Sequence, residues 1–185
     1  MILSEKQKDA AYWWADPGAE LIDGIIGDGA IRSGKTLAMS LGFVLWSMMT
    51  FQDENFALCG KTIQSLRRNV IKPLKVLLES FKEVNLIITE HRSENYMTIS
   101  DGVVSNDYYL FGGKDESSQD LIQGLTLAGV FLDEVALMPE SFVNQATGRC
   151  SITDSKMWFN CNPEGPEHYF KVNWVDKADE KRLLH

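Results

Sequence analysis

Short runs of apolar residues alternate with longer ones along the chain, and polar turns separate them. The short runs are rich in β-branched and aromatic residues, which is typical of buried strands. They predict strands at residues 21–26, 56–60, 85–90, 96–100, 108–111, 130–132 and 157–160. The longer runs predict helices at residues 4–14, 37–49, 63–80 and 141–149. The final residues, 181–185, predict the start of a further strand, as in a truncated chain.

Local signals mark where several of these elements begin, bend and turn. Ser4 and Gln7 have the spacing of a helix capping box, so they predict the start of the first helix. Pro73 cannot donate a backbone hydrogen bond, and we expect it to kink or restart the helix at 63–80. The Asp-Gly turn at 101–102 predicts a small antiparallel element in the middle of the chain.

The alternation of strands and helices predicts an α/β fold, with a mostly parallel central sheet flanked by helices and a small antiparallel addition. The chain has 185 residues, 44% of them hydrophobic and 24% charged, which is ordinary for one globular domain. It shows no internal repeat and no Gly/Ser-rich linker, so we expect a single domain at 1–185. The apolar helix at 37–49 is shorter than the roughly 20 residues that a bilayer requires, and we expect it in the core rather than in a membrane.

Charge and cysteine usage narrow the class of protein. The net charge of −8 argues against a basic surface, so any contact with nucleic acid must come from a local patch, a partner or another region. No secretory signal begins the chain, which predicts a cytoplasmic protein. Three scattered cysteines are typical of reduced core thiols, and the three histidines lack the spacing of a metal site.

One motif carries the strongest chemical information, because residues 29–36 fit the pattern G-x-x-x-x-G-K-[ST] of a phosphate-binding P-loop. Its residues are Gly29, Ala30, Ile31, Arg32, Ser33, Gly34, Lys35 and Thr36. Backbone N–H groups of such a loop surround a polyphosphate at the positive end of the following helix. We expect Lys35 to reach the β- and γ-phosphates of ATP and Thr36 to bind Mg²⁺. The alternative is a glycine-rich turn before a helix.

A second motif, Asp133 and Glu134, directly follows an apolar strand. Next to a P-loop, Asp133 is expected to hold Mg²⁺ and Glu134 to polarise the water that attacks the γ-phosphate. This pair favours an ATPase over a small-molecule kinase, which must exclude that water. The alternative is an acidic pair that merely ends a strand.

The long separation of Lys35 and Asp133 leaves room for an extra strand between the strands that carry them, which marks the RecA-like branch of P-loop ATPases. Members of this branch place a polar residue on the neighbouring strand to sense the γ-phosphate. Asn160 and Asn162 follow an apolar run in the right order, and we favour Asn162. The alternative is that the Asn-Pro pair at 162–163 only forms a turn.

Three segments together resemble the amino-terminal ATPase domain of the large subunit of tailed-phage terminases, which pump viral DNA into a capsid. They are the P-loop with its internal Arg32, the block 127–139 with the acidic pair, and residues 148–166. The resemblance covers almost the whole chain. The family's carboxy-terminal nuclease domain has no counterpart here, so nuclease activity is expected only from that missing domain.

The resemblance also implies roles for further residues. It implies that Gln7 contacts adenine, although its capping-box position is an equally good structural explanation. Arg32 resembles a P-loop arginine that touches the γ-phosphate in some relatives, or it braces the loop. Other relatives carry a trans-acting arginine where this chain has Gln123 and Gly124. The remaining candidates for that catalytic arginine are, in order, Arg149 and then Arg67 or Arg68.

The resemblance further implies cofactors and partners, namely ATP, Mg²⁺, double-stranded DNA, the portal protein ring and the terminase small subunit. It implies a homo-oligomeric ring on the portal, a monomer in isolation, and a place in the cytoplasm of an infected bacterium, docked at the procapsid. Two alternatives are a helicase-like translocase ATPase of the same branch and a non-hydrolysing nucleotide-dependent docking module.

Overall fold

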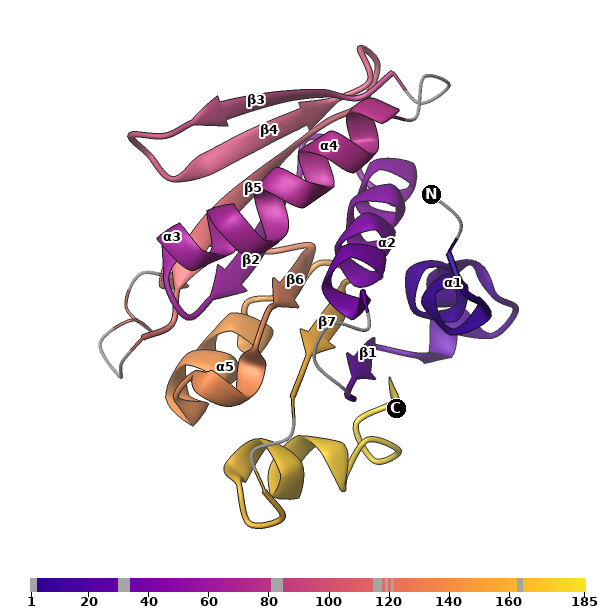
Figure 1. Ribbon diagram of the computed structural model, residues 1–185, viewed down its shortest axis with the longest axis vertical. Coiled ribbons are helices and arrows are strands. Elements are labelled where there is room, and N and C mark those ends of the chain that lie inside the picture. Colours follow the sequence, from indigo (N-terminus) through magenta and orange to yellow (C-terminus); the bar gives the residue numbers. More distant parts are fainter. Residues whose placement is uncertain are drawn as a thin grey trace.

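One sheet of eight strands, in the order β3-β4-β5-β2-β6-β7-β1-β8, forms the centre of the computed structural model (Figure 1). The structure describes residues 3–29, 34–80, 85–114, 118, 120, 122–162 and 165–185. The strands are β1 (Gly24–Gly27), β2 (Asn55–Gly60), β3 (Ile87–His91), β4 (Tyr96–Ser100), β5 (Ser105–Gly112), β6 (Gly129–Leu132), β7 (Lys156–Asn160) and β8 (Leu183–Leu184).

In the described part of the chain, five α-helices and several short helical turns surround the sheet. The α-helices are α1 (Glu5–Tyr12), α2 (Lys35–Thr50), α3 (Ile63–Leu66), α4 (Lys72–Ser80) and α5 (Glu140–Gly148). The 3₁₀ turns are η1 (Trp13–Ala15), η2 (Ala19–Leu21) and η5 (Val135–Leu137), and the π-helical segments are η3 (Arg67–Ile71) and η6 (Lys171–Val175).

The pairing of the strands confirms the predicted sheet. Strands β5, β2, β6, β7, β1 and β8 pair in parallel, whereas β3 and β4 add an antiparallel extension beside β5. β7 lies between β1 and β6, so one strand separates the strands that carry the two motifs, as expected. It follows Asp133 in the chain, however, so the long separation of Lys35 and Asp133 does not account for it. The short β8 at the end of the chain pairs with β1.

Two apolar cores lie on opposite faces of the sheet. On one face, α2 and α4 pack against β2, β5, β6 and β7, with Phe43, Trp46 and Trp158 at the centre. On the other face, α5 and η6 pack against the same sheet through residues such as Phe142 and Trp174. Figure 1 shows α2 and α4 side by side and α5 near the ends of β6 and β7.

Helix α2 is apolar around most of its circumference because it is enclosed by the sheet, α1 and α4. Gly42 allows α1 to approach closely, since a Cβ atom at this position would lie 2.3 Å from the Ala11 carbonyl oxygen. Within the part of the chain that the structure describes, no helix combines the length and the apolar character needed to cross a membrane.

The boundaries of one strand and two helices differ from the predicted ones. The helix at 63–80 is interrupted by the π-helical η3, and it restarts as α4 at Lys72, one residue before Pro73, in agreement with the expected kink or restart. The strand predicted from residue 21 begins only at Gly24, because Ala19–Leu21 form a 3₁₀ turn. The first helix ends at Tyr12, and η1 continues it to Ala15.

Candidate active site

Three parallel strands end next to one another and bring the two sequence motifs together. Gly27 at the end of β1 lies opposite Asn160 at the end of β7, and Leu132 at the end of β6 lies opposite Phe159. The residues after these strands therefore line one edge of the sheet. Ligands of open α/β sheets bind outside the carboxyl ends of the strands, which makes this edge the candidate site.

The glycines of the P-loop motif have the backbone conformations that the motif requires. Gly29 and Gly34 have φ angles of 131° and 77°, in the region that favours glycine. Gly34 is the N-cap of α2, so the helix begins at Lys35 and directs its positive end toward the loop. The remaining predicted loop residues, Ala30, Ile31, Arg32 and Ser33, lie outside the described residues.

The amine of Lys35 lies between the loop and the end of β7. It donates hydrogen bonds to the carbonyl oxygen of Gly29, to that of Cys161 at 3.3 Å and to Asn162 Oδ1 at 3.2 Å. Burial lowers the pKa of Lys35, while the charge of Asp28 acts in the opposite direction. The ammonium group is thus held by neutral oxygens, which phosphate oxygens can replace.

A compact polar cluster lies beside this lysine. Asn160 Nδ2 donates to Asp133 Oδ1 at 2.6 Å and to Thr36 Oγ1 at 2.8 Å, and Thr36 Oγ1 lies 3.5 Å from the same carboxylate oxygen. Asp133 and Asn160 are both 4% exposed. Burial raises the pKa of Asp133 to about 6, although the hydrogen bond from Asn160 opposes this.

The cluster has the oxygen donors that Mg²⁺ prefers. The hydroxyl of Thr36 and the carboxylate of Asp133 converge, and the Oδ1 atom of Asn160 is buried without a hydrogen-bond partner. Among the described residues, no group of three or more His, Cys, Asp or Glu side chains could enclose a metal by itself. A magnesium ion that keeps several water and phosphate ligands fits this donor set.

In metal-free buffer, Asp133 is expected to make the chain less stable as the pH rises. Its pKa is about 6 in the folded chain and about 3.9 in an unfolded chain. The folded state holds this proton more tightly, so the stabilisation is present below about pH 4 and is lost as the pH rises through about 6. The expected loss in the free energy of unfolding is about 3 kcal/mol.

Urea unfolding in EDTA between about pH 4 and 7 measures this loss. Asp133→Asn cannot ionise and should lack this loss, so equal pH profiles would refute the prediction.

Glu134 occupies a strained backbone conformation next to the cluster. Its φ and ψ angles are 55° and 46°, in the left-handed region that a residue with a Cβ atom rarely adopts. The turn separates the two neighbouring carboxylates, so that Asp133 is buried against α2 while the Glu134 side chain is half-buried. Strain of about 1–3 kcal/mol at such positions is typical of functional sites.

Gln7 fulfils its capping role and also contacts the P-loop. Its Oε1 atom accepts from the Ser4 N–H at 2.9 Å, which completes the predicted capping box. A Cβ atom on Gly34 would lie 2.4 Å from Gln7 Nε2, so the amide group packs on the end of the loop. A cavity of about 370 Å³ extends from here between α1 and the loop, lined in part by Gln7, Lys35 and Met39. It offers space for a nucleotide base.

The arginines predicted as trans-acting candidates do not join the site of their own chain. Arg149 follows α5, and its carbonyl oxygen accepts from Leu127 N at 2.9 Å before the start of β6, at the opposite edge of the sheet. With the Gln145 amide turned so that its oxygen faces the guanidinium group, Arg149 Nε lies 3.2 Å from it. Arg67 binds Glu90 and Arg68 is exposed.

Asn160 belongs to the site, although the sequence pattern favoured Asn162. Side chains alternate along β7, and Trp158 faces the core under α2, so Asn160 faces α2 as well. This alternation was the signal that could have identified it. Asn162 instead contacts Lys35, so both asparagines lie in the site and their separate roles remain predictions.

Comparison with known proteins decides the family. The profile described as "Terminase large subunit, T4likevirus-type, N-terminal" matches residues 26–183, which is most of the chain. The chain belongs to the terminase large subunit family. This confirms the resemblance that the motifs indicated. No curated protein sequence matches the chain at a significant level.

Solved structures of large terminases share the fold. The large terminase of a thermophilic bacteriophage is 57% identical, with a TM-score of 0.93, and the match covers 100% of this chain and 45% of that chain. A second structure of the same phage terminase, in complex with ATP-gamma-S, is 54% identical with a TM-score of 0.90, covering 100% and 44%. The chain therefore spans a little under half of that terminase.

A more distant structure supports the fold alone. The ATPase domain of the Thermus phage P74-26 large terminase is 19% identical, with a TM-score of 0.56, and the match covers 77% of this chain and 60% of that chain. Together with the structures of the thermophilic-bacteriophage terminase, this match confirms the predicted RecA-like α/β fold.

Proposed function

We propose that this chain is an ATPase domain that binds ATP and Mg²⁺ at the carboxyl edge of its sheet and hydrolyses the ATP to drive double-stranded DNA into a procapsid. The observation that carries the proposal is the cluster of Thr36, Asp133 and Asn160 beside the Lys35 amine. The similar large terminase of the thermophilic bacteriophage has been solved in complex with ADP and with ATP-gamma-S, which supports nucleotide binding by this chain.

Residues of the two motifs share the binding of the triphosphate. The Lys35 ammonium exchanges its carbonyl and amide partners for oxygens of the β- and γ-phosphates. Thr36 and Asp133 would hold Mg²⁺, which neutralises charge on the phosphates when it is bound. Gln7 lies at the end of the loop, next to the cavity where the adenine would bind.

Glu134 is the residue proposed to act on water. It directly follows the proposed metal ligand Asp133, and its half-buried carboxylate accepts a proton from the attacking water. Asn162 is proposed to sense the γ-phosphate. Because its Oδ1 atom accepts from Lys35, movement of the lysine toward the phosphates breaks this contact and frees the asparagine.

Partners complete the proposed motor. Double-stranded DNA is the proposed substrate of translocation, and the portal ring and the small subunit are the proposed docking partners in the cytoplasm of the infected bacterium. We propose that the chain forms a ring on the portal and is a monomer alone. In that ring a neighbour supplies the catalytic arginine, with Arg149 as the first candidate, while Arg32 acts within its own loop.

Hydrolysis is therefore expected to depend on both Mg²⁺ and assembly. Phosphate release should be absent in EDTA and should rise more than linearly with protein concentration, because a neighbour must present the arginine.

Arg149→Ala should bind ATP normally but lose this concentration-dependent gain, since such arginines contribute about 10³-fold or more. Unchanged assembly-dependent activity would exclude Arg149 and leave Arg67, Arg68 or Arg32. The absence of Mg²⁺-dependent phosphate release from the intact chain at any protein concentration would refute the ATPase proposal.

A further inference from the structure

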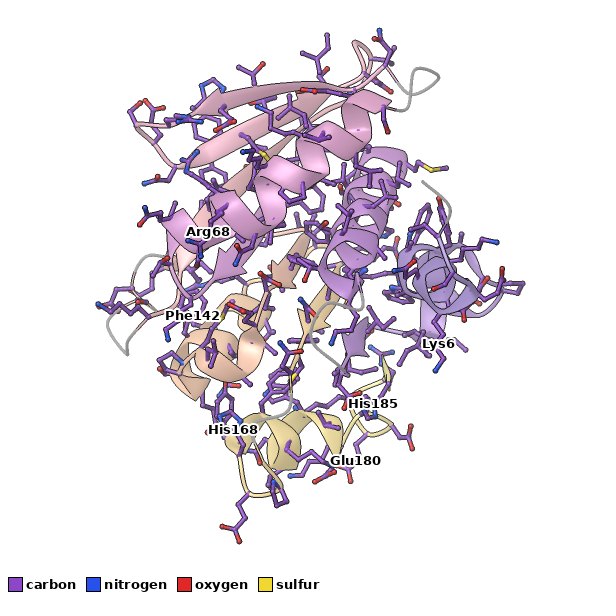
Figure 2. The ribbon with its side chains drawn as sticks, viewed as in Figure 1. Lys6, Arg68, Phe142, His168, Glu180 and His185 are labelled. Atoms are coloured by element: carbon purple, nitrogen blue, oxygen red, sulfur yellow. The ribbon has the colours of Figure 1, made fainter. Side chains whose placement is uncertain are left out.

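A groove lined with basic side chains lies far along the sheet from the nucleotide site. It has a volume of about 460 Å³ and lies between the helical segment α3–η3–α4 and the β3–β4 hairpin. Its basic residues are Arg67, Arg68, Lys72, Lys75 and Arg92, against the acidic Glu79 and Glu90. Figure 2 labels Arg68 on this helical segment, on the opposite side of the view from Lys6 and His185.

Glu90 organises the floor of the groove. Its carboxylate binds Arg67 at 3.0 Å, Lys75 at 2.7 Å and Arg92 at 3.1 Å. The Glu90 side chain is 15% exposed, whereas that of Arg92 is 77% exposed. One carboxylate cannot neutralise three cations, so the cluster keeps excess positive charge and holds it in place.

The helical wall adds further positive charge. Arg68 in the π-helical η3 and Lys72 and Lys75 in α4 all line the groove, so the helical wall presents three cations to it. Each DNA strand carries one phosphate per ~3.4 Å of helix axis, so three cations on one wall can contact neighbouring phosphates of one strand.

We propose that this groove binds the phosphate backbone of double-stranded DNA. The inference rests on the proposed packaging function and deepens it by assigning the DNA-contacting surface. The whole chain has a net charge of −8, so contact with a polyanion requires a local basic patch of this kind. Cations held in place along a helical wall fit the regularly spaced phosphates of duplex DNA. They fit an acidic protein segment less well, because its charges are irregularly spaced.

The groove is also connected to the nucleotide site. Segment α3 begins three residues after Gly60, the last residue of β2. Cys59, on the same strand, accepts a hydrogen bond from the Asp133 backbone N–H at 2.8 Å. A shift of the acidic motif during hydrolysis can therefore move β2 and the basic helical wall that follows it.

The test measures binding of a fluorescein-labelled duplex of random sequence by anisotropy, from about 20 to 300 mM NaCl. Lys72→Gln combined with Arg92→Gln removes two exposed groove charges. The matched control, Lys8→Gln combined with Lys177→Gln, removes two exposed charges elsewhere. We expect the groove variant to bind at least about tenfold more weakly at low salt. Its slope of log K against log[salt] should fall by about 2, since each lost phosphate contact contributes about 0.9.

A second variant and a second polyanion test the proposal further in the same binding assay. Glu79→Gln removes a repulsive charge from the groove and should strengthen duplex binding, which a misfolded variant could not do. Unchanged binding by the groove variant, or no salt-dependent binding by the intact chain, would overturn the proposal. Binding of poly-glutamate as tightly as the duplex would also overturn it and identify an acidic protein segment as the partner. Titration with fluorescent ATP of the same samples tests the proposed function separately.

Discussion

Lys35→Ala is expected to weaken ATP binding by about 100-fold or more. The variant removes the ammonium group that the P-loop holds between Gly29 and Asn162. Each charge-assisted hydrogen bond to a phosphate contributes about 1.5–3 kcal/mol, and two phosphates lose such a bond. Titration with a fluorescent ATP analogue measures the change in Kd.

The fold should survive this substitution. Lys35 is half-buried, and the oxygens that it contacts can bind water instead, so unfolding free energy should change by only about 1 kcal/mol. Lys8→Ala is a matched control, because Lys8 is an exposed lysine of α1 that is not among the described residues lining the proposed adenine cavity. Its ATP affinity should remain close to that of the intact chain. An unchanged Kd in Lys35→Ala would mean that the loop does not bind the triphosphate.

Glu134→Gln is expected to separate binding from hydrolysis. Glutamine preserves the shape of the side chain and most of its hydrogen bonding but cannot accept the proton of the attacking water. General-base catalysis contributes about 10²–10⁴-fold, so phosphate release should fall by that factor while the Kd for ATP stays within about twofold.

A nearby glutamate provides the control for this prediction. Glu140 lies in the first turn of α5, and its carboxylate accepts from Asn173 at 2.8 Å. Glu140→Gln keeps this hydrogen bond possible and removes the same charge, so its phosphate release should remain near that of the intact chain. If both variants hydrolysed ATP at the same rate, the catalytic role would belong to another residue.

The sequence predicts most of the fold because apolar runs and turn residues act locally. The parallel core strands are continuous apolar runs, and the Asp-Gly turn at 101–102 correctly indicates the antiparallel extension. Boundaries are less predictable, since they depend on tertiary contacts. Leu21 belongs to an apolar run yet ends a 3₁₀ turn, and it remains 65% exposed.

The chemistry of the site is predictable only where one motif contains it. Lys35 and Thr36 are adjacent in the P-loop, so their roles follow from the pattern. Asn160 contacts Thr36 and Asp133 only because β7 lies between β1 and β6, and this strand order depends on the whole sheet. A trans-acting arginine depends on the position of a second chain, which no single sequence specifies.

A single-turnover experiment tests whether Asp133 and Glu134 cleave ATP with Mg²⁺. The intact chain, at high concentration, is loaded with γ-labelled ATP in EDTA, and excess Mg²⁺ starts the reaction before quenching at set times. The bound ATP should be cleaved only after Mg²⁺ is added, and Glu134→Gln should retain its ATP uncleaved over the same period. Cleavage in EDTA, or cleavage by Glu134→Gln at the rate of the intact chain, would contradict the assignment of Asp133 and Glu134.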